Sequence, residues 1–247
     1  MRTIAPPSPA PGPPAAEPGD RTTRRLLWCG VVAGPLFVVT FLAQGAVRDH
    51  YDWLRHPVSS LALGGSGWIQ TANFIVAGLL SLAAAAGLRR ALTSSPQRRG
   101  SLWGPILVGA WAVALITAGV FTTDPVSGYP PGTPDLLADY GSLHAALHDL
   151  LSLPGFVALP VACVVFAVRF ARLREPGRAV WSGIAAVVFV AADVLATSGF
   201  AQNAALVAYG GLFQRVAVTA GWAWLTLLAL HLLAARATPA GQDRPVR

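Results

Sequence analysis

Long apolar stretches dominate the chain, and short polar segments separate them. Each stretch is about 20 residues long, which is the length of helix that crosses the hydrocarbon core of a bilayer. The stretches cover residues 26–47, 68–88, 102–121, 143–168, 180–200 and 212–235. This pattern predicts an all-α fold, an integral membrane bundle of six transmembrane helices.

Two polar tails are predicted to flank this bundle. Residues 1–22 are rich in proline, alanine and glycine and carry no apolar periodicity, so we expect a disordered tail. The transmembrane domain then covers residues 23–236, and a short second tail covers 237–247. The first apolar stretch is too long for the apolar region of a signal peptide, so we expect it to be retained as a helix.

The composition favours a membrane protein over a soluble one. Hydrophobic residues make up 54% of the chain and charged residues only 12%, whereas charged residues make up about a quarter of an ordinary soluble domain. Both cysteines, Cys29 and Cys163, fall inside apolar stretches, where thiols act as small packing residues. We therefore expect no disulfide framework. Membrane lipids are the expected partners, and the sequence indicates no protein partner.

The basic residues predict the orientation of the bundle. All 18 are arginine, and they gather in or directly beside the two tails and in the connections 89–101 and 169–179, with only Arg48, Arg55 and Arg215 elsewhere. The positive-inside rule then predicts that both termini are cytoplasmic. Because the arginines follow the topology, the net charge of +7 does not indicate nucleic-acid binding. Arginine without lysine suggests a GC-rich bacterial genome, and we expect the protein in the plasma membrane.

Most of the chemically versatile side chains lie on the opposite, external side. They occur in the connections 48–67 and 122–142 and in the first turns of the fourth stretch. We expect eight of them to form a polar cluster near the membrane surface: Asp52, Arg55, His56, Ser59, Asp124, His144, His148 and Asp149. Arg55 is expected to bridge to an acid, because its planar guanidinium pairs well with carboxylates.

Several short motifs in these segments resemble those of a known family. They are Asp52 with Arg55-His56-Pro57, Ser59-Ser60-Leu61, Gly67-Trp68 with Gln70, Asn73-Phe74, Asp124-Pro125, Leu143-His144 with His148, and Gln214-Arg215. Over about residues 25–235 the chain resembles the bacterial six-helix membrane proteins called "domain of unknown function 998". The resemblance implies six spans. It implies no activity, because none is established for that family.

A metal site is one interpretation of the polar cluster. His144 and His148 are four residues apart, so a helix places both on one face. Such a pair can bind Zn²⁺ when a third protein ligand completes the site, and His56 and Asp124 are the expected further ligands. The alternative is a hydrogen-bond cluster that orders the loops, in which Ser59 caps a loop instead of acting as a nucleophile.

Two charged residues are predicted to lie within the membrane. Asp193 falls inside the fifth apolar stretch, and Arg215 falls near the start of the sixth. A charge at that depth is costly and is usually paired, so we expect the two side chains to form a buried pair. Such a pair would either fix the register of the helices or relay protons or substrate.

These observations favour one function and leave a second open. The favoured function is that of a ligand-binding, lipid-binding or structural membrane protein. The alternative is a metal-dependent membrane hydrolase that acts on a lipid-like substrate, so enzymatic activity stays an open question. A transporter has less support, because the six stretches show no internal repeat. The sequence contains no Walker or haem motif that would favour a nucleotide-driven or redox role.

Overall fold

The computed structural model of the protein describes residues 18–93, 102–136 and 139–237, and most of the two predicted tails lies outside these ranges. Six long helices occupy most of the described chain: α1 (Pro18–Val47), α2 (Trp68–Thr93), α3 (Trp103–Val120), α4 (Leu143–Arg172), α5 (Pro176–Phe200) and α6 (Gly210–Ala237). Two short 3-10 helices, η1 (Val58–Ala62) and η3 (Val207–Tyr209), lie in the connections. All six long helices are long and apolar enough to cross a membrane, which confirms the predicted six-helix bundle.

The outward surface of the bundle is apolar, as contact with lipid requires. Val187 and Leu150, which a soluble protein would bury, have exposed fractions of 68% and 65%. Trp68 and Trp103, the first residues of α2 and α3, are also exposed. Tryptophan is enriched at membrane–water interfaces, so this placement fits helices that end at the membrane surface. The protein is therefore a multi-pass membrane protein.

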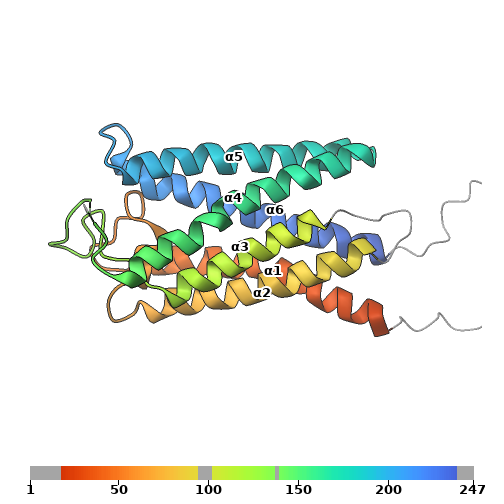
Figure 1. Ribbon diagram of the computed structural model, residues 1–247, viewed down its shortest axis with the longest axis horizontal. Coiled ribbons are helices and arrows are strands. Elements are labelled where there is room, and N and C mark those ends of the chain that lie inside the picture. The colour runs from red at the N-terminus through yellow and green to blue at the C-terminus, as the bar shows by residue number, and fades with distance from the viewer. Residues whose placement is uncertain (1–17, 94–101, 137–138, 238–247) are drawn as a thin grey trace, which may run out of the picture.

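The six helices form a closed ring. Each helix packs against its neighbours in the sequence, and α6 returns to pack against α1. The connections that follow α1, α3 and α5 gather at one end of the bundle, which we call the loop face, whereas α1 begins and α6 ends at the other end (Figure 1). α4 runs diagonally between α3 and α5 and continues through Pro154 and Pro160 (Figure 1).

An aromatic core fills the middle of the ring. The ring centroids of Phe37 and Trp222 are 5.3 Å apart, those of Trp222 and Trp111 are 5.7 Å apart, and those of Trp111 and Phe189 are 6.3 Å apart. Beside this core α1 approaches α6 closely because Gly34 has no side chain. A Cβ atom at Gly34 would lie 3.1 Å from the carbonyl oxygen of Trp222.

A buried amide network joins α1 to α2. The Oε1 atom of Gln70 accepts hydrogen bonds from Gln44 Nε2 at 2.9 Å and from Asn73 Nδ2 at 3.3 Å. Asn73 Nδ2 also donates to the carbonyl oxygen of Phe37 at 3.2 Å. Polar side chains that hydrogen-bond between helices stabilise packing in a membrane. Two residues of the family-like motifs, Gln70 and Asn73, thus act in helix association.

The first helix begins before the predicted domain boundary at residue 23. α1 starts at Pro18, and the Asp20 carboxylate pairs with Arg236 near the end of α6 at 2.7 Å. An acidic residue in the first turn also interacts favourably with the positive end of the helix dipole. These two contacts extend the helix into the segment that the composition predicts as a tail.

Candidate functional site

A cavity beneath the loop face is the candidate functional site. It has a volume of about 480 Å³, which is within the range typical of small-molecule sites. Every one of the six long helices contributes to its lining, together with η1 and the connection after α3. The cavity therefore lies inside the ring, in the half of the bundle next to the loops.

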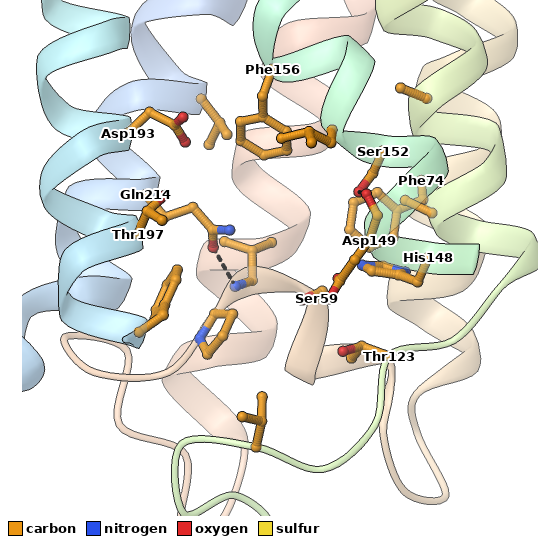
Figure 2. Close-up of a pocket in the computed structure, with 18 of the residues that line it drawn as sticks. Ser59, Phe74, Thr123, His148, Asp149, Ser152, Phe156, Asp193, Thr197 and Gln214 are labelled. Carbon is orange, nitrogen blue, oxygen red and sulfur yellow. Dashed lines mark hydrogen bonds between the residues drawn. The ribbon is translucent and has the colours of Figure 1, made fainter. Parts of the chain in front are cut away.

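The lining of the cavity has an apolar part and a polar part. The apolar part includes Phe37, Phe74, Trp111, Phe156 and Val218. The polar part includes Ser59, Thr123, Ser152, Thr197 and Gln214 and the titratable residues His148, Asp149 and Asp193. In Figure 2, Asp193 and Phe156 lie deepest among the labelled side chains, and Thr123 lies nearest to the loops. Such a lining can hold an apolar chain together with a polar group.

Arg215 of α6 holds the connection after α1 over the cavity. Its Nη1 donates to the carbonyl oxygens of His56 at 3.0 Å and Gly211 at 2.9 Å, and its Nη2 donates to the Tyr51 hydroxyl. The guanidinium also lies over the rings of Phe41 and Tyr51, with 5.7 Å and 5.6 Å to their centroids. Burial raises the pKa of Tyr51 to about 12, so the phenol stays neutral in this contact.

This arrangement corrects the predicted pair of Asp193 and Arg215. The donors of Arg215 go to backbone carbonyls and to Tyr51, and Asp193 instead faces the cavity from α5 (Figure 2). Asp193 forms no hydrogen bond or ion pair within the described residues. The guanidinium carries five donors, and carbonyl and hydroxyl oxygens can accept its hydrogen bonds where no carboxylate is near.

His56 is a buried part of the loop scaffold. Its Nδ1 accepts a hydrogen bond from the backbone N–H of Asp52 at 2.9 Å, and the ring contacts both Tyr51 and Tyr129, which also contact each other. The side chain of Asp52 in turn accepts from the N–H of Leu54 at 2.9 Å. Burial lowers the pKa of His56, so the ring is neutral near pH 7. Its Nδ1 lone pair is occupied and is not available to a metal ion.

Two acids of the loop face order the chain locally. Asp135 pairs with Arg55 at 2.6 Å, so Arg55 has the acidic partner that its chemistry predicts. Asp124 accepts from the backbone N–H groups of Gly141 at 2.7 Å and Ser142 at 3.1 Å, and from the Ser142 hydroxyl at 2.8 Å. The same hydroxyl caps α4 by accepting from Ala145 N–H at 3.1 Å. Asp124 therefore ties the connection after α3 to the start of α4.

His148 lines the cavity and contacts the end of α3 through its ring. Its Nδ1 lies 2.7 Å from the carbonyl oxygen of Phe121, and because a carbonyl only accepts, Nδ1 carries the proton. When the ring is neutral, Nε2 is then an acceptor. Asp149 lines the cavity next to it and accepts from the Tyr140 hydroxyl at 3.0 Å. That bond raises the pKa of Tyr140. His144 lies exposed against Phe121.

The structure distributes the four proposed zinc ligands over different contacts. His148 lines the cavity, Asp124 accepts hydrogen bonds from Gly141 and Ser142 before α4, His56 uses Nδ1 within the loop, and His144 is exposed. Within residues 18–93, 102–136 and 139–237, no three residues among histidine, cysteine, aspartate and glutamate are grouped as a metal site would require. The zinc site stays a prediction.

Sequence reasoning missed several residues of the cavity. Ser152 lies one helical turn after His148, and Thr197 lies one turn after Asp193. Residues four apart share one face of a helix, so the two polar faces of α4 and α5 could have been read from this spacing. Gln214, which the sequence shows only as part of a family-like motif, lines the cavity and accepts a hydrogen bond from the N–H of Val58, the first residue of η1, at 2.8 Å.

The fold and the cavity define a six-helix membrane protein with a partly polar site below its loops. Residues 31–231 match the model of a family described as "Protein of unknown function (DUF998)", and the chain belongs to that family. This match confirms the resemblance seen in the sequence motifs, and it covers all residues that line the cavity. Neither a curated protein nor a solved structure matches the chain.

Proposed function

We propose that this protein binds an amphiphilic small molecule or lipid in the cavity beneath its loop face. The observation that carries the proposal is the cavity itself, which combines an aromatic part with polar side chains in about 480 Å³. An amphiphile has the matching composition, because its chain can contact Phe74, Trp111 and Phe156 while its polar group contacts Ser59, Thr197 or Gln214. Apolar pockets with a few convergent polar groups are the usual form of ligand sites.

The position of the cavity supports a ligand that arrives from the lipid. Leu153 of α4 lines the cavity and has an exposed fraction of 62%, and Thr197 and Ala201 at the end of α5 are exposed lining residues as well. Leu153 and Thr197 belong to two adjacent helices of the ring, and Ala201 directly follows the second of them. An amphiphile dissolved in the bilayer could thus enter between α4 and α5 without leaving the membrane.

The distribution of arginine supports an external site in a bacterial plasma membrane. The tails and the connections at the end opposite the loop face carry most of the 18 arginines. The positive-inside rule assigns that end to the cytoplasm, with both termini there. The cavity would then bind ligand from the outer leaflet.

Filling the cavity tests the proposal. Thr197→Phe places a larger side chain in the lining, and Val194→Phe places the same side chain on the outward surface of α5 as a matched control. The probe is bromododecanol, an uncharged amphiphile whose bromine quenches tryptophan fluorescence, and Trp111 lies in the cavity. In nanodiscs of zwitterionic lipid we expect saturable quenching of the wild-type protein and of Val194→Phe. For Thr197→Phe the apparent affinity should fall by about tenfold or more.

Two results would contradict the proposal. One is quenching of the wild-type protein that rises without saturation, which is simple partition into the bilayer. The other is an equal affinity in Thr197→Phe and Val194→Phe, because a ligand in the cavity must respond to its filling.

A further inference from the structure

We propose that the ligand of this cavity is a cationic amphiphile, whose ammonium group pairs with Asp193. This inference rests on the proposed function and names the chemical class of the ligand. It follows from the charges that line the cavity, from the contacts of the nearby arginines and from the position of Asp193.

The charged residues that line the cavity are acids. Asp149 and Asp193 contribute carboxylates, and no arginine of the described part of the chain belongs to the lining. The chain contains no lysine at all. His148 is the remaining titratable residue of the lining, and its Nε2 is an acceptor when the ring is neutral. An anionic ligand would therefore find two like charges here, and a cationic ligand would find two opposite charges.

The arginines near the loop face are engaged elsewhere. Arg48 donates to the carbonyl oxygens of Leu61 and Leu63 and to the Ser66 hydroxyl. Arg55 pairs with Asp135, as described above. Arg215 donates to two carbonyl oxygens and to Tyr51. None of these three guanidinium groups belongs to the cavity lining, so none of them neutralises its acids.

Asp193 occupies the position at which pairing with a bound cation would contribute most to ligand binding. It lies about two turns before the end of α5 at Phe200, within a helix that is apolar enough to cross the membrane. Within the described residues it has no hydrogen-bond or ion-pair partner, and its side chain points toward the cavity (Figure 2). An ionisable group at that depth normally pairs with an opposite charge, and the residues that the structure describes supply none.

The neighbours of Asp193 also suit an ammonium group. Thr197 lies one turn further along α5 and lines the same cavity, so its hydroxyl oxygen can accept a second hydrogen bond. Phe156 lies at the same depth across the cavity (Figure 2). The face of an aromatic ring attracts a cation. The ammonium would thus meet a carboxylate, a hydroxyl and an aromatic ring, while the chain extends along the apolar lining.

Competition between matched amphiphiles tests the charge of the ligand. Dodecylamine and dodecyl sulfate have the same chain and opposite charge, and each is titrated against bound bromododecanol in zwitterionic nanodiscs. We expect dodecylamine to displace the probe at a concentration lower by at least about tenfold. Asp193→Asn, which keeps the size of the side chain and removes its charge, should abolish this preference while bromododecanol still binds.

Asp49→Asn is the matched control for a general change in surface charge. Asp49 is an exposed acid of the connection after α1 and does not line the cavity, so this variant should keep the preference for dodecylamine. Direct titration of bromododecylamine into the wild-type protein shows, without displacement, whether a cationic amphiphile binds more tightly than the uncharged bromododecanol.

The possible failures are distinguishable. If neither bromododecanol nor bromododecylamine binds with saturation, the proposed amphiphile site is wrong and this inference fails with it. If bromododecanol binds but the two charged competitors displace it equally, only the inference about charge is overturned. It is also overturned if Asp193→Asn keeps the preference, because the cation would then pair elsewhere.

Discussion

At the scale of single residues, the polar side chains of the loop face mainly form hydrogen bonds with the backbone. Arg215 donates to carbonyl oxygens, Asp124 accepts from two backbone N–H groups, and His56 accepts from another. A buried backbone group without a partner is costly, and long polar side chains can satisfy it where no helix continues. The sequence shows which residues carry donors and acceptors, but it does not show which backbone groups a loop will leave unpaired. The predicted pair of Asp193 and Arg215 was wrong for that reason.

His56 should make the stability of the protein depend on pH. Burial lowers its pKa in the folded state below the ordinary value of 6.5. Between these two pKa values the unfolded chain binds more protons than the folded protein, so the free energy of unfolding falls as the pH drops. The contribution is complete above about pH 6.5 and is lost progressively below it.

The matching experiment follows the melting temperature in detergent between about pH 5 and pH 8. His56→Asn keeps an acceptor near the Asp52 N–H and removes the titrating ring, so its melting temperature should decline less on acidification. His50→Asn is the control, because His50 is exposed and asparagine tolerates its positive φ of 57°. Identical pH profiles for wild type and His56→Asn would show that another group controls acid stability.

At the scale of elements, the start of α6 is the joint between the bundle and its loops. The N–H groups of Gly211 and Leu212 donate to the carbonyl oxygens of Arg55 at 3.1 Å and Leu54 at 2.8 Å. The first N–H groups of a helix have no partner within the helix, so the connection after α1 supplies acceptors to them. This approach of backbone to backbone requires a residue without a side chain at position 211.

Gly211→Ala should therefore destabilise the protein. The added Cβ would collide with the carbonyl oxygen of His56 and lie 2.9 Å from the carbonyl carbon of Arg55. We expect a loss of about 1–3 kcal/mol in the free energy of unfolding, the usual size for a steric clash in a packed region. Gly183→Ala in α5 is the control, because nothing lies within 4 Å of its added Cβ. Equal melting temperatures for the two variants would mean that the loop yields without cost.

The boundaries of the elements show how far periodicity predicts structure. α2 begins at Trp68, where the apolar stretch 68–88 begins, and α5 ends at Phe200, where the stretch 180–200 ends. α1 begins earlier than the composition predicts because Asp20 forms an ion pair with Arg236, which is far away in the sequence. Hydropathy reports burial in lipid, so it finds the spans and misses helical turns that a single tertiary contact stabilises.

At the scale of the whole molecule, the packing of the helices into a ring creates a cavity that no single span could form. The cavity is lined by every long helix, so its shape depends on how α6 closes against α1 and how α4 crosses between its neighbours. The sequence could predict six spans, because apolar length is a local property. It could not predict a cavity, because an enclosed volume depends on packing between segments far apart in the chain.

The orientation of this ring in the membrane can be tested with two single cysteines. Ala204 lies exposed in the connection after α5 at the loop face, and Gly177 lies exposed in the first turn of α5 at the opposite end, where an added Cβ meets open space. If the positive-inside rule holds, a membrane-impermeant thiol reagent in intact cells should label Ala204→Cys and not Gly177→Cys. Both should react once the membrane is permeabilised, which controls for accessibility.

The native Cys163 is buried and Cys29 is half-buried in α1, so wild-type protein reports the background. Labelling of Gly177→Cys alone would place the loop face and its cavity in the cytoplasm, and the ligand would then come from the inner leaflet.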